Sequence, residues 1–136
     1  MATVAGLLDT SVVVRYLTND NAILAERAAT IIDTLPGLGI TPVVLLETAF
    51  VLERLYGYSR ESVVEALLLF LQKDNLVILD LPKELAIQAL LLCRPSARVS
   101  FGDAFIWAQA IAHSVERVFT FDARFPLNGI KGSSPW

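Results

Sequence analysis

Short apolar segments alternate with longer segments along the whole chain, and this alternation limits the fold more than any other feature. The short segments, at residues 4–8, 39–41, 76–79 and 118–121, have the length and composition of buried strands. The longer segments have helix start and stop signals and are expected at residues 11–16, 22–35, 42–57, 60–71, 82–94 and 100–113. Strands that alternate with helices form parallel sheets covered by helices. The sequence therefore predicts an α/β protein with three layers, α/β/α, around a central, mostly parallel sheet.

No linker or repeat divides the 136 residues, so a single domain over residues 1–136 is expected. Although 54% of the residues are hydrophobic, the longest clean apolar stretches, at 66–71 and 89–93, are far shorter than a membrane span. No basic region precedes the first apolar segment, so no signal peptide is expected and the protein is predicted to be cytoplasmic. The surplus of apolar residues predicts either a homodimer or partner interface, or a dense core.

Four acidic residues stand at the ends of apolar segments or inside them: Asp9, Glu47, Asp103 and Asp122. An ionised carboxylate beside apolar surface is costly unless a cation or strong hydrogen bonds compensate. In parallel sheets the ligand crevice lies beyond the carboxyl ends of the strands, where one crevice could collect all four acids. Carboxylate oxygens suit Mg²⁺ or Mn²⁺, so the pattern predicts a metal site.

Each of three acids also has a purely structural interpretation. Asp9 could cap the helix that follows it. Asp103 could complete a capping box with Ser100, and Asp122 could begin a turn before Arg124. The sequence leaves both interpretations open for each of these residues. The placement of all four acids beside apolar segments, Glu47 included, nevertheless favours the metal site.

Of the two acids expected in helices, Glu47 is more telling than Asp103, because its neighbours on the same helix face are apolar. The alternative is that Glu47 pairs with Arg54 along a solvent-exposed stripe. Three hydroxyl residues, Thr10, Ser11 and Thr120, lie beside the strand-end acids. They could orient carboxylates or hold water at the site, or simply cap helices.

Other chemistries are poorly served by this chain. Cys93 and His113 are the only cysteine and histidine, which excludes a Cys/His zinc site within one chain, and no nucleophile-elbow motif accompanies His113. A haloacid-dehalogenase-like phosphatase would need an acid where Ser11 stands. A receiver domain would need acids ahead of Asp9 and a better placed lysine than Lys131.

The net charge of −3 at first argues against a nucleic-acid partner. When the four proposed site acids are left out, however, 10 of the 14 acidic residues remain against 11 basic residues, so the rest of the chain is about neutral. Arg15, Arg98 and Arg124 are candidate phosphate contacts, because each lies near a proposed site segment.

The ordered set of motifs resembles the PIN-domain ribonucleases over essentially the whole chain. It consists of Asp9-Thr10-Ser11 after the first strand, Glu47 in the helix after Pro42, Asp103-Ala104 opening an apolar helix, and Thr120-Phe121-Asp122 after the last strand. Within that group, the opening from Asp9 to Leu17 resembles the VapC toxins of toxin-antitoxin pairs. Two positions depart from the family pattern: Ser11 stands where Asn is frequent, and no acid immediately precedes Asp103.

The resemblance implies a PIN-like fold and a metal-dependent endoribonuclease that leaves 3′-hydroxyl and 5′-phosphate ends. It implies that the four acids hold one or two Mg²⁺ or Mn²⁺ ions, with the three hydroxyl residues assisting. It also implies an inhibitory partner, a small antitoxin whose carboxy-terminal segment lies over the active groove. The alternatives are a housekeeping PIN nuclease in RNA processing, or a catalytically silent PIN-like module that binds RNA or protein.

Overall fold

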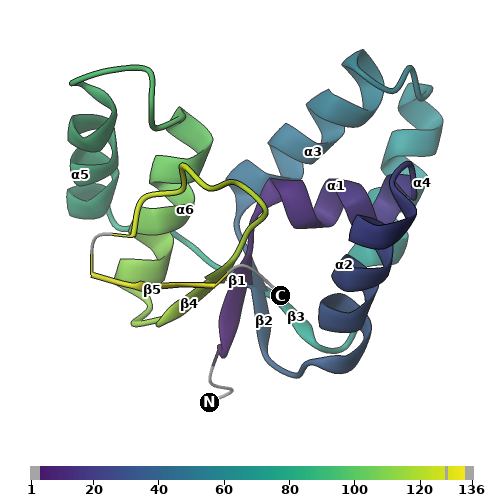
Figure 1. Ribbon diagram of the computed structural model, residues 1–136, viewed down its shortest axis with the longest axis horizontal. Helices are drawn as coiled ribbons and strands as arrows, with labels where there is room; N and C mark the ends of the chain where they lie inside the picture. The colour runs from purple at the N-terminus through teal and green to yellow at the C-terminus, as the bar shows by residue number, and fades with distance from the viewer. Residues whose placement is uncertain (1–3, 128, 134–136) are drawn as a thin grey trace.

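The protein is built around a five-stranded sheet in which every neighbouring pair of strands is parallel (Figure 1). The computed structural model describes residues 4–127 and 129–133. The strands follow the order β3-β2-β1-β4-β5 across the sheet. Their bounds are β1 Gly6–Leu8, β2 Leu38–Ile40, β3 Leu76–Ile78, β4 Arg117–Phe119 and β5 Lys131–Ser133.

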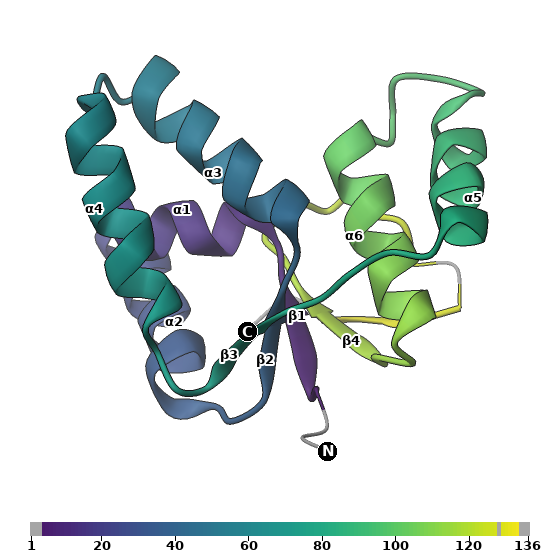
Figure 2. The ribbon, with the colours of Figure 1, turned by 180° about the vertical axis from the view of Figure 1, so that it is seen from behind.

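Six helices connect the strands and confirm the expected α/β architecture. They are α1 Thr10–Thr18, α2 Ala22–Thr34, α3 Pro42–Arg54, α4 Arg60–Leu71, α5 Lys83–Cys93 and α6 Phe101–Ala112. Helices α1, α2 and α4 lie together on one side of the sheet, and α5 and α6 lie together on the other (Figure 1, Figure 2). Helix α3 contacts α1, α4 and α6, so it joins the two groups of helices.

Helix starts follow from local capping chemistry. Thr41 caps α3 by accepting a hydrogen bond from the Val44 amide at 3.1 Å, and Pro42 occupies the first turn, where its missing N–H costs nothing. Ser59 caps α4 as the sequence predicts. Asp9 occupies the capping position of α1, in agreement with one of its two interpretations, whereas Thr10 and Ser11, which are also capping residues by type, lie inside the helix.

The tail contains a strand that the sequence does not signal. The sequence from residue 128 on is rich in turn-forming residues, and 118–121 is the last strand that it predicts, yet β5 pairs with β4 in parallel register. Strand β5 reads Lys-Gly-Ser and has no apolar pattern, so only its pairing with β4 defines it. Residues 128 and 134–136, also in the expected tail, lie outside the described residues.

The strand order places a topological switch point between β1 and β4. From β1 the chain moves outward to β2 and β3 on one side, then returns to place β4 on the other side of β1. The helices after β1 and after β3 lie on opposite faces of the sheet, and in open parallel sheets ligands bind at the carboxyl ends of the strands beside such a switch point. The sequence places Asp9 and Asp122 at these ends of β1 and β4.

The core lies on both faces of the central strands. The fully buried side chains include Leu7 and Leu8 of β1, Ile40 of β2, Ile106 of α6 and Val118 of β4. A core that holds both β1 and β4 in place fixes the backbone positions from which the site residues emerge. Among the described residues, no helix combines the length and apolar character needed to cross a membrane.

Candidate active site

Asp9 and Asp122 meet at the carboxyl ends of two adjacent strands. Leu8 of β1 is paired with Phe119 of β4, and the Asp9 amide donates a hydrogen bond to the Phe119 carbonyl at 2.9 Å. This pairing brings the two chain segments together although they are more than 100 residues apart. Asp9 is 2% exposed, so its carboxyl group depends on the protein for its solvation.

Two hydroxyl groups hold the Asp9 carboxyl group. Ser11 Oγ and Thr120 Oγ1 both donate to Asp9 Oδ2, at 3.1 and 2.5 Å. Each hydroxyl oxygen in turn accepts a backbone amide hydrogen: that of Phe121 to Ser11 at 3.0 Å, and that of Asp122 to Thr120 at 2.9 Å. Because the amides occupy the acceptor side of each hydroxyl, the hydroxyl hydrogens are directed to Asp9. The predicted role of Ser11 and Thr120 in orienting a carboxylate agrees with this geometry.

Glu47 of α3 and Asp103 of α6 approach from the helices. Thr10 Oγ1 donates to Glu47 Oε1 at 2.7 Å, so the third hydroxyl also holds a carboxylate. The alternative pairing of Glu47 with Arg54 is not what the structure shows, since the Arg54 guanidinium lies 5.6 Å from the centre of the Phe50 ring. Glu47 is half-buried, and Asp103 is 8% exposed.

The carboxyl groups are close enough to disturb one another's ionisation. Burial, followed by repulsion from Asp9 and Asp122 and a hydrogen bond with Asp122, raises the pKa of Asp103 to about 8, and the charge on Glu47 adds to the effect. Burial also raises the pKa of Asp9, against the hydrogen bonds that its carboxyl group accepts. For Asp122, burial opposes ionisation, but hydrogen bonds from the Arg124 amide and side chain outweigh it and keep its pKa below the usual value. The site thus has more negative charge than its surroundings compensate.

The donor set suits a hard divalent cation. All four site acids offer carboxylate oxygens, the ligands that Mg²⁺ and Mn²⁺ prefer. In the positions that they adopt, no three His, Cys, Asp or Glu side chains among residues 4–127 and 129–133 form a ready-made metal site. A cation would therefore have to draw the carboxylates together. Because the raised pKa keeps Asp103 protonated at neutral pH, the cation would also displace that proton.

The structural interpretations of the acids hold alongside the functional one. Asp9 caps α1 by accepting the Thr10 amide hydrogen at 2.8 Å. Asp122 Oδ1 accepts from the Arg124 amide at 2.9 Å and from its Nε at 3.3 Å, as in the expected turn. The Ser100 hydroxyl accepts from the Asp103 amide at 3.0 Å, which gives the Ser100 half of the proposed capping box. These local bonds fix the side chains where the site needs them.

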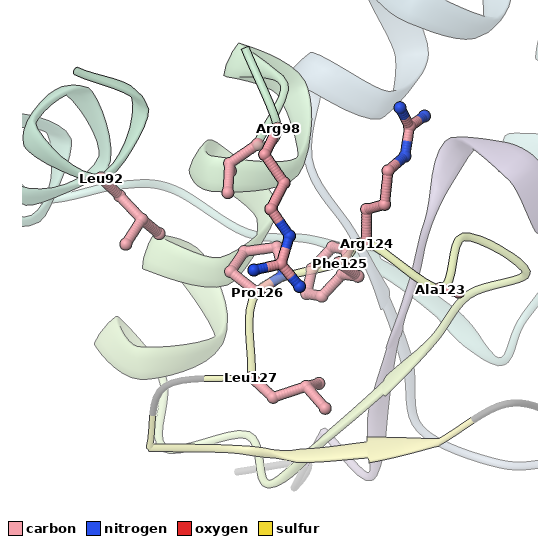
Figure 3. A pocket seen from close by; sticks show the side chains of 8 residues that line it. Leu92, Arg98, Ala123, Arg124, Phe125, Pro126 and Leu127 are labelled. Atoms are coloured by element: carbon pink, nitrogen blue, oxygen red, sulfur yellow. The ribbon is translucent and has the colours of Figure 1, made fainter. Parts of the chain in front are cut away.

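A pocket of about 360 Å³ is lined in part by residues 123–127, the segment that directly follows Asp122 (Figure 3). Its lining includes Arg98 from the loop before α6, together with apolar side chains that include Phe125 and Pro126. The Arg98 side chain extends across the pocket toward Pro126, whereas the Arg124 side chain points away from it (Figure 3). Arg15, the third candidate phosphate contact, pairs with Asp20 at 2.9 Å.

The only histidine lies far from the four acids along α6. His113 caps the carboxyl end of this helix, and its Nε2 lies 2.8 Å from the Asp80 carbonyl. Asp103 occupies the first turn of α6, so roughly 15 Å of helix separates the two.

One residue at the site was not anticipated from the sequence. Gly102 is buried in the first turn of α6, and the Glu47 carboxylate occupies the space that a side chain at position 102 would take. A glycine inside an expected helix, directly before a candidate site acid, is the only signal that the sequence offers for it.

Comparison with known proteins identifies the family of the chain. A family model described as PIN domain matches residues 6–130. No curated protein matches the chain in sequence.

Three solved structures share the fold. VapC20 of Mycobacterium tuberculosis, a Sarcin-Ricin loop cleaving toxin, is 24% identical with a TM-score of 0.74, covering 93% of this chain and 96% of its own. VapBC2 from Rickettsia felis, bound to a DNA fragment from its promoter, is 17% identical with a TM-score of 0.62, covering 94% and 96%. PAE2754 from Pyrobaculum aerophilum is 16% identical with a TM-score of 0.61, covering 97% and 90%.

Proposed function

The chain belongs to the PIN domain family, and from this premise we propose that it is a metal-dependent endoribonuclease, the toxin of a toxin-antitoxin pair. The observation that carries the proposal is the proximity of four acids, Asp9, Glu47, Asp103 and Asp122, at the carboxyl ends of the adjacent strands β1 and β4. Residues 1–136 are proposed to form one PIN-like domain, acting in the cytoplasm where its RNA substrate would be found.

We propose that these four carboxylates hold one or two Mg²⁺ or Mn²⁺ ions. When bound, such ions would offset the charge of the phosphodiester and activate water for in-line attack on phosphorus. The chain's own contribution is positional. The Ser11 and Thr120 hydroxyls hold Oδ2 of Asp9, and the Thr10 amide holds its Oδ1. The Thr10 hydroxyl holds Oε1 of Glu47, so both carboxylates are already oriented by hydrogen bonds from the protein.

The test is cleavage of total RNA by the purified protein, with Mn²⁺ or Mg²⁺, with EDTA, and with the Asp9→Asn variant. Asp74→Asn, at an exposed acid, is the matched control. Cleavage that requires both the metal and Asp9, and that survives the control substitution, supports the proposal. Undiminished cleavage by Asp9→Asn would exclude it.

The RNA strand is proposed to pass over the pocket beside Asp122. Arg98 spans the pocket, and its guanidinium has no carboxylate partner among the described residues, so it is free to contact a phosphate. Arg124 borders both the pocket and Asp122, and Arg15 would first have to leave Asp20, an exposed ion pair that contributes little. Arg98→Gln should raise KM for RNA and leave kcat unchanged. Arg117→Gln, at the opposite end of β4, should change neither.

Two protein partners are proposed, a second copy of the chain and a small antitoxin. The support is the exposure of large apolar side chains on separate helices: Leu46 (72%) and Phe50 (59%) on α3, and Ile87, Leu90 and Leu91 on α5. Part of the predicted apolar surplus therefore lies on the surface. Light scattering after size-exclusion chromatography should give a dimer mass. Intact-mass analysis of the co-expressed pair should show the antitoxin.

One observation favours a second candidate, a catalytically silent RNA- or protein-binding module. The described side chains do not form a ready-made metal site. Calorimetric titration with Mn²⁺ separates the two candidates: binding that is lost in Asp9→Asn favours the nuclease, and no binding by the unmodified protein favours the silent module.

A further inference from the structure

The position of Glu47 depends on the absence of a side chain at Gly102. A Cβ atom built on Gly102 would overlap both oxygens and the carboxyl carbon of Glu47. No other atoms lie as near to that position, so the side chain of Glu47 is packed directly against the backbone of the first turn of α6.

Backbone geometry does not account for a glycine at position 102. Gly57 and Gly129 have positive φ angles of 69° and 79°, a conformation that favours glycine, but Gly102 is an ordinary helical residue outside that region. Glycine in a helix costs about 0.5–1 kcal/mol relative to alanine. Alanine would therefore suit the helix better, and the space beside Glu47 is what distinguishes glycine here.

The electrostatics of the site make this space important. Charges on Glu47 and Asp9 repel each other, and both disfavour ionisation of Asp103. Repulsion alone would move the flexible Glu47 side chain away, and within the part of the chain that the structure describes, the hydrogen bond from Thr10 opposes this movement. Contact with the amino-terminal turn of α6 adds the favourable interaction of an anion with exposed helix amides.

We propose that Gly102 is a positioning residue, which admits the Glu47 carboxylate to the acidic site. The inference rests on the proposed metal-dependent function and extends it to a residue that contributes no side chain of its own. The atoms that a methyl group at position 102 would meet belong to the far end of a flexible side chain. The substitution Gly102→Ala would thus move the Glu47 carboxylate and spare the backbone.

The first experiment measures Mn²⁺ binding by calorimetry in four proteins: unmodified, Gly102→Ala, Glu47→Asp and the double variant. We expect Gly102→Ala to weaken Mn²⁺ binding by about tenfold or more, the range typical of lost support for a metal ligand. Aspartate is shorter than glutamate by one methylene group, which makes room for the added methyl group. The double variant should therefore bind Mn²⁺ more tightly than Gly102→Ala alone, whereas independent effects would make it the weakest binder.

The second experiment separates this inference from the proposed ribonuclease function. Melting temperatures of the EDTA-treated protein are measured for Gly102→Ala in the unmodified background and in the Glu47→Ala background. With Glu47 removed, alanine should raise the melting temperature by about 3 °C through its helix propensity. With Glu47 present, the gain should be smaller or reversed.

Equal gains in both backgrounds would overturn the inference, whether or not the protein binds metal or cleaves RNA. Failure of RNA cleavage alone, with the rescue by Glu47→Asp and the unequal gains retained, would reject the ribonuclease proposal and keep the role of Gly102. If the unmodified protein binds no Mn²⁺, the melting experiment decides by itself.

Discussion

The acidic site has two sides that are built differently. On the strand side, Asp9 accepts two hydroxyl hydrogens, and each of those hydroxyl groups is itself fixed by a backbone amide of the segment after β4. On the helix side, Glu47 accepts one hydrogen bond among the residues that the structure describes, from Thr10, and its carboxylate packs against the backbone of Gly102. The strand side is therefore preorganised by the sheet, whereas the helix side depends on how α3 and α6 pack together.

This difference indicates how such a site tolerates its own charge. A buried carboxylate that accepts several hydrogen bonds can stay in place without a cation, because the donors replace its hydration. A half-buried carboxylate on a long side chain can move instead. We infer that a cation would meet a fixed ligand in Asp9 and an adjustable one in Glu47, and substitutions on the two sides should differ accordingly.

The largest expected effect is the dependence of folding stability on pH, which arises from the repulsion among the carboxylates of the two sides. The pKa of Asp103 is about 8 in the folded protein against an ordinary value of 3.8, so between these values the folded state holds a proton that the unfolded chain has lost. Folding is therefore most favoured by this group at low pH, and the benefit is lost as the pH rises toward 8. The raised pKa of Asp9 acts in the same direction.

Urea unfolding of EDTA-treated protein at pH 5 and pH 8 measures this effect. One pKa unit corresponds to about 1.4 kcal/mol, so over the three pH units between pH 5 and pH 8 Asp103 should contribute a decline on the order of 4 kcal/mol. Asp103→Asn should flatten the decline, and Asp74→Asn should leave it unchanged. Added Mn²⁺ should restore stability more at pH 8 than at pH 5. A decline of the same size in Asp103→Asn would contradict the assignment.

The next effect tests the preorganised strand side. Thr120→Val keeps the shape of the side chain but removes the donor to Asp9 and the acceptor for the Asp122 amide. We expect the free energy of unfolding to fall by about 1–3 kcal/mol and metal-dependent cleavage to fall about 100-fold. Thr30→Val, at an exposed helix position, is the matched control and should stay within about 0.5 kcal/mol. Cleavage within twofold of the unmodified protein would show that this support is dispensable.

The strand side was also the more predictable from sequence. Asp9 and Asp122 directly follow apolar strands, and parallel strands bring such positions to one edge, so their meeting follows from local pattern and general topology. Ser59 and Pro42 likewise mark helix starts by local chemistry alone. Asp9 also caps α1, which was one of its two interpretations from the sequence, although Thr10 and Ser11 are equally good capping residues by type.

The helix side was less predictable, because it depends on contacts between distant segments. The overlap of Glu47 with the side-chain space of Gly102 exists only once α3 packs against α6, and no local pattern encodes that distance. Strand β5 is similar, since Lys-Gly-Ser becomes a strand by pairing with β4. The pairing of Arg15 with Asp20 across the end of α1 also requires the left-handed turn at Asn19.

A smaller effect is expected from the support of Glu47. Thr10→Val removes the hydrogen bond to Glu47 Oε1, but Glu47 is half-buried, and water can replace the lost donor. Cleavage should fall about tenfold, less than for Thr120→Val, with a change of under about 1 kcal/mol in the free energy of unfolding. Thr10→Ser, which keeps the hydroxyl group, should restore most of the activity. If Thr10→Val lost as much activity as Thr120→Val, the two sides would be equally dependent on their hydroxyl groups.

The smallest effect is expected for a third threonine, Thr48, where the same substitution by valine should stabilise the protein and not destabilise it. Thr48 follows Glu47 on α3 and is fully buried, and its hydroxyl oxygen has no hydrogen-bond partner among the described residues. Replacing an unpaired buried hydroxyl with a methyl group removes a desolvation cost and leaves the helix propensity nearly unchanged. Thr48→Val should therefore raise the free energy of unfolding by about 0.5–1 kcal/mol in urea titrations, with cleavage unaltered. A loss of stability or activity would mean that the Thr48 hydroxyl supports the site as those of Thr10 and Thr120 do. The helix side would then be held by more than the hydrogen bond from Thr10 to Glu47.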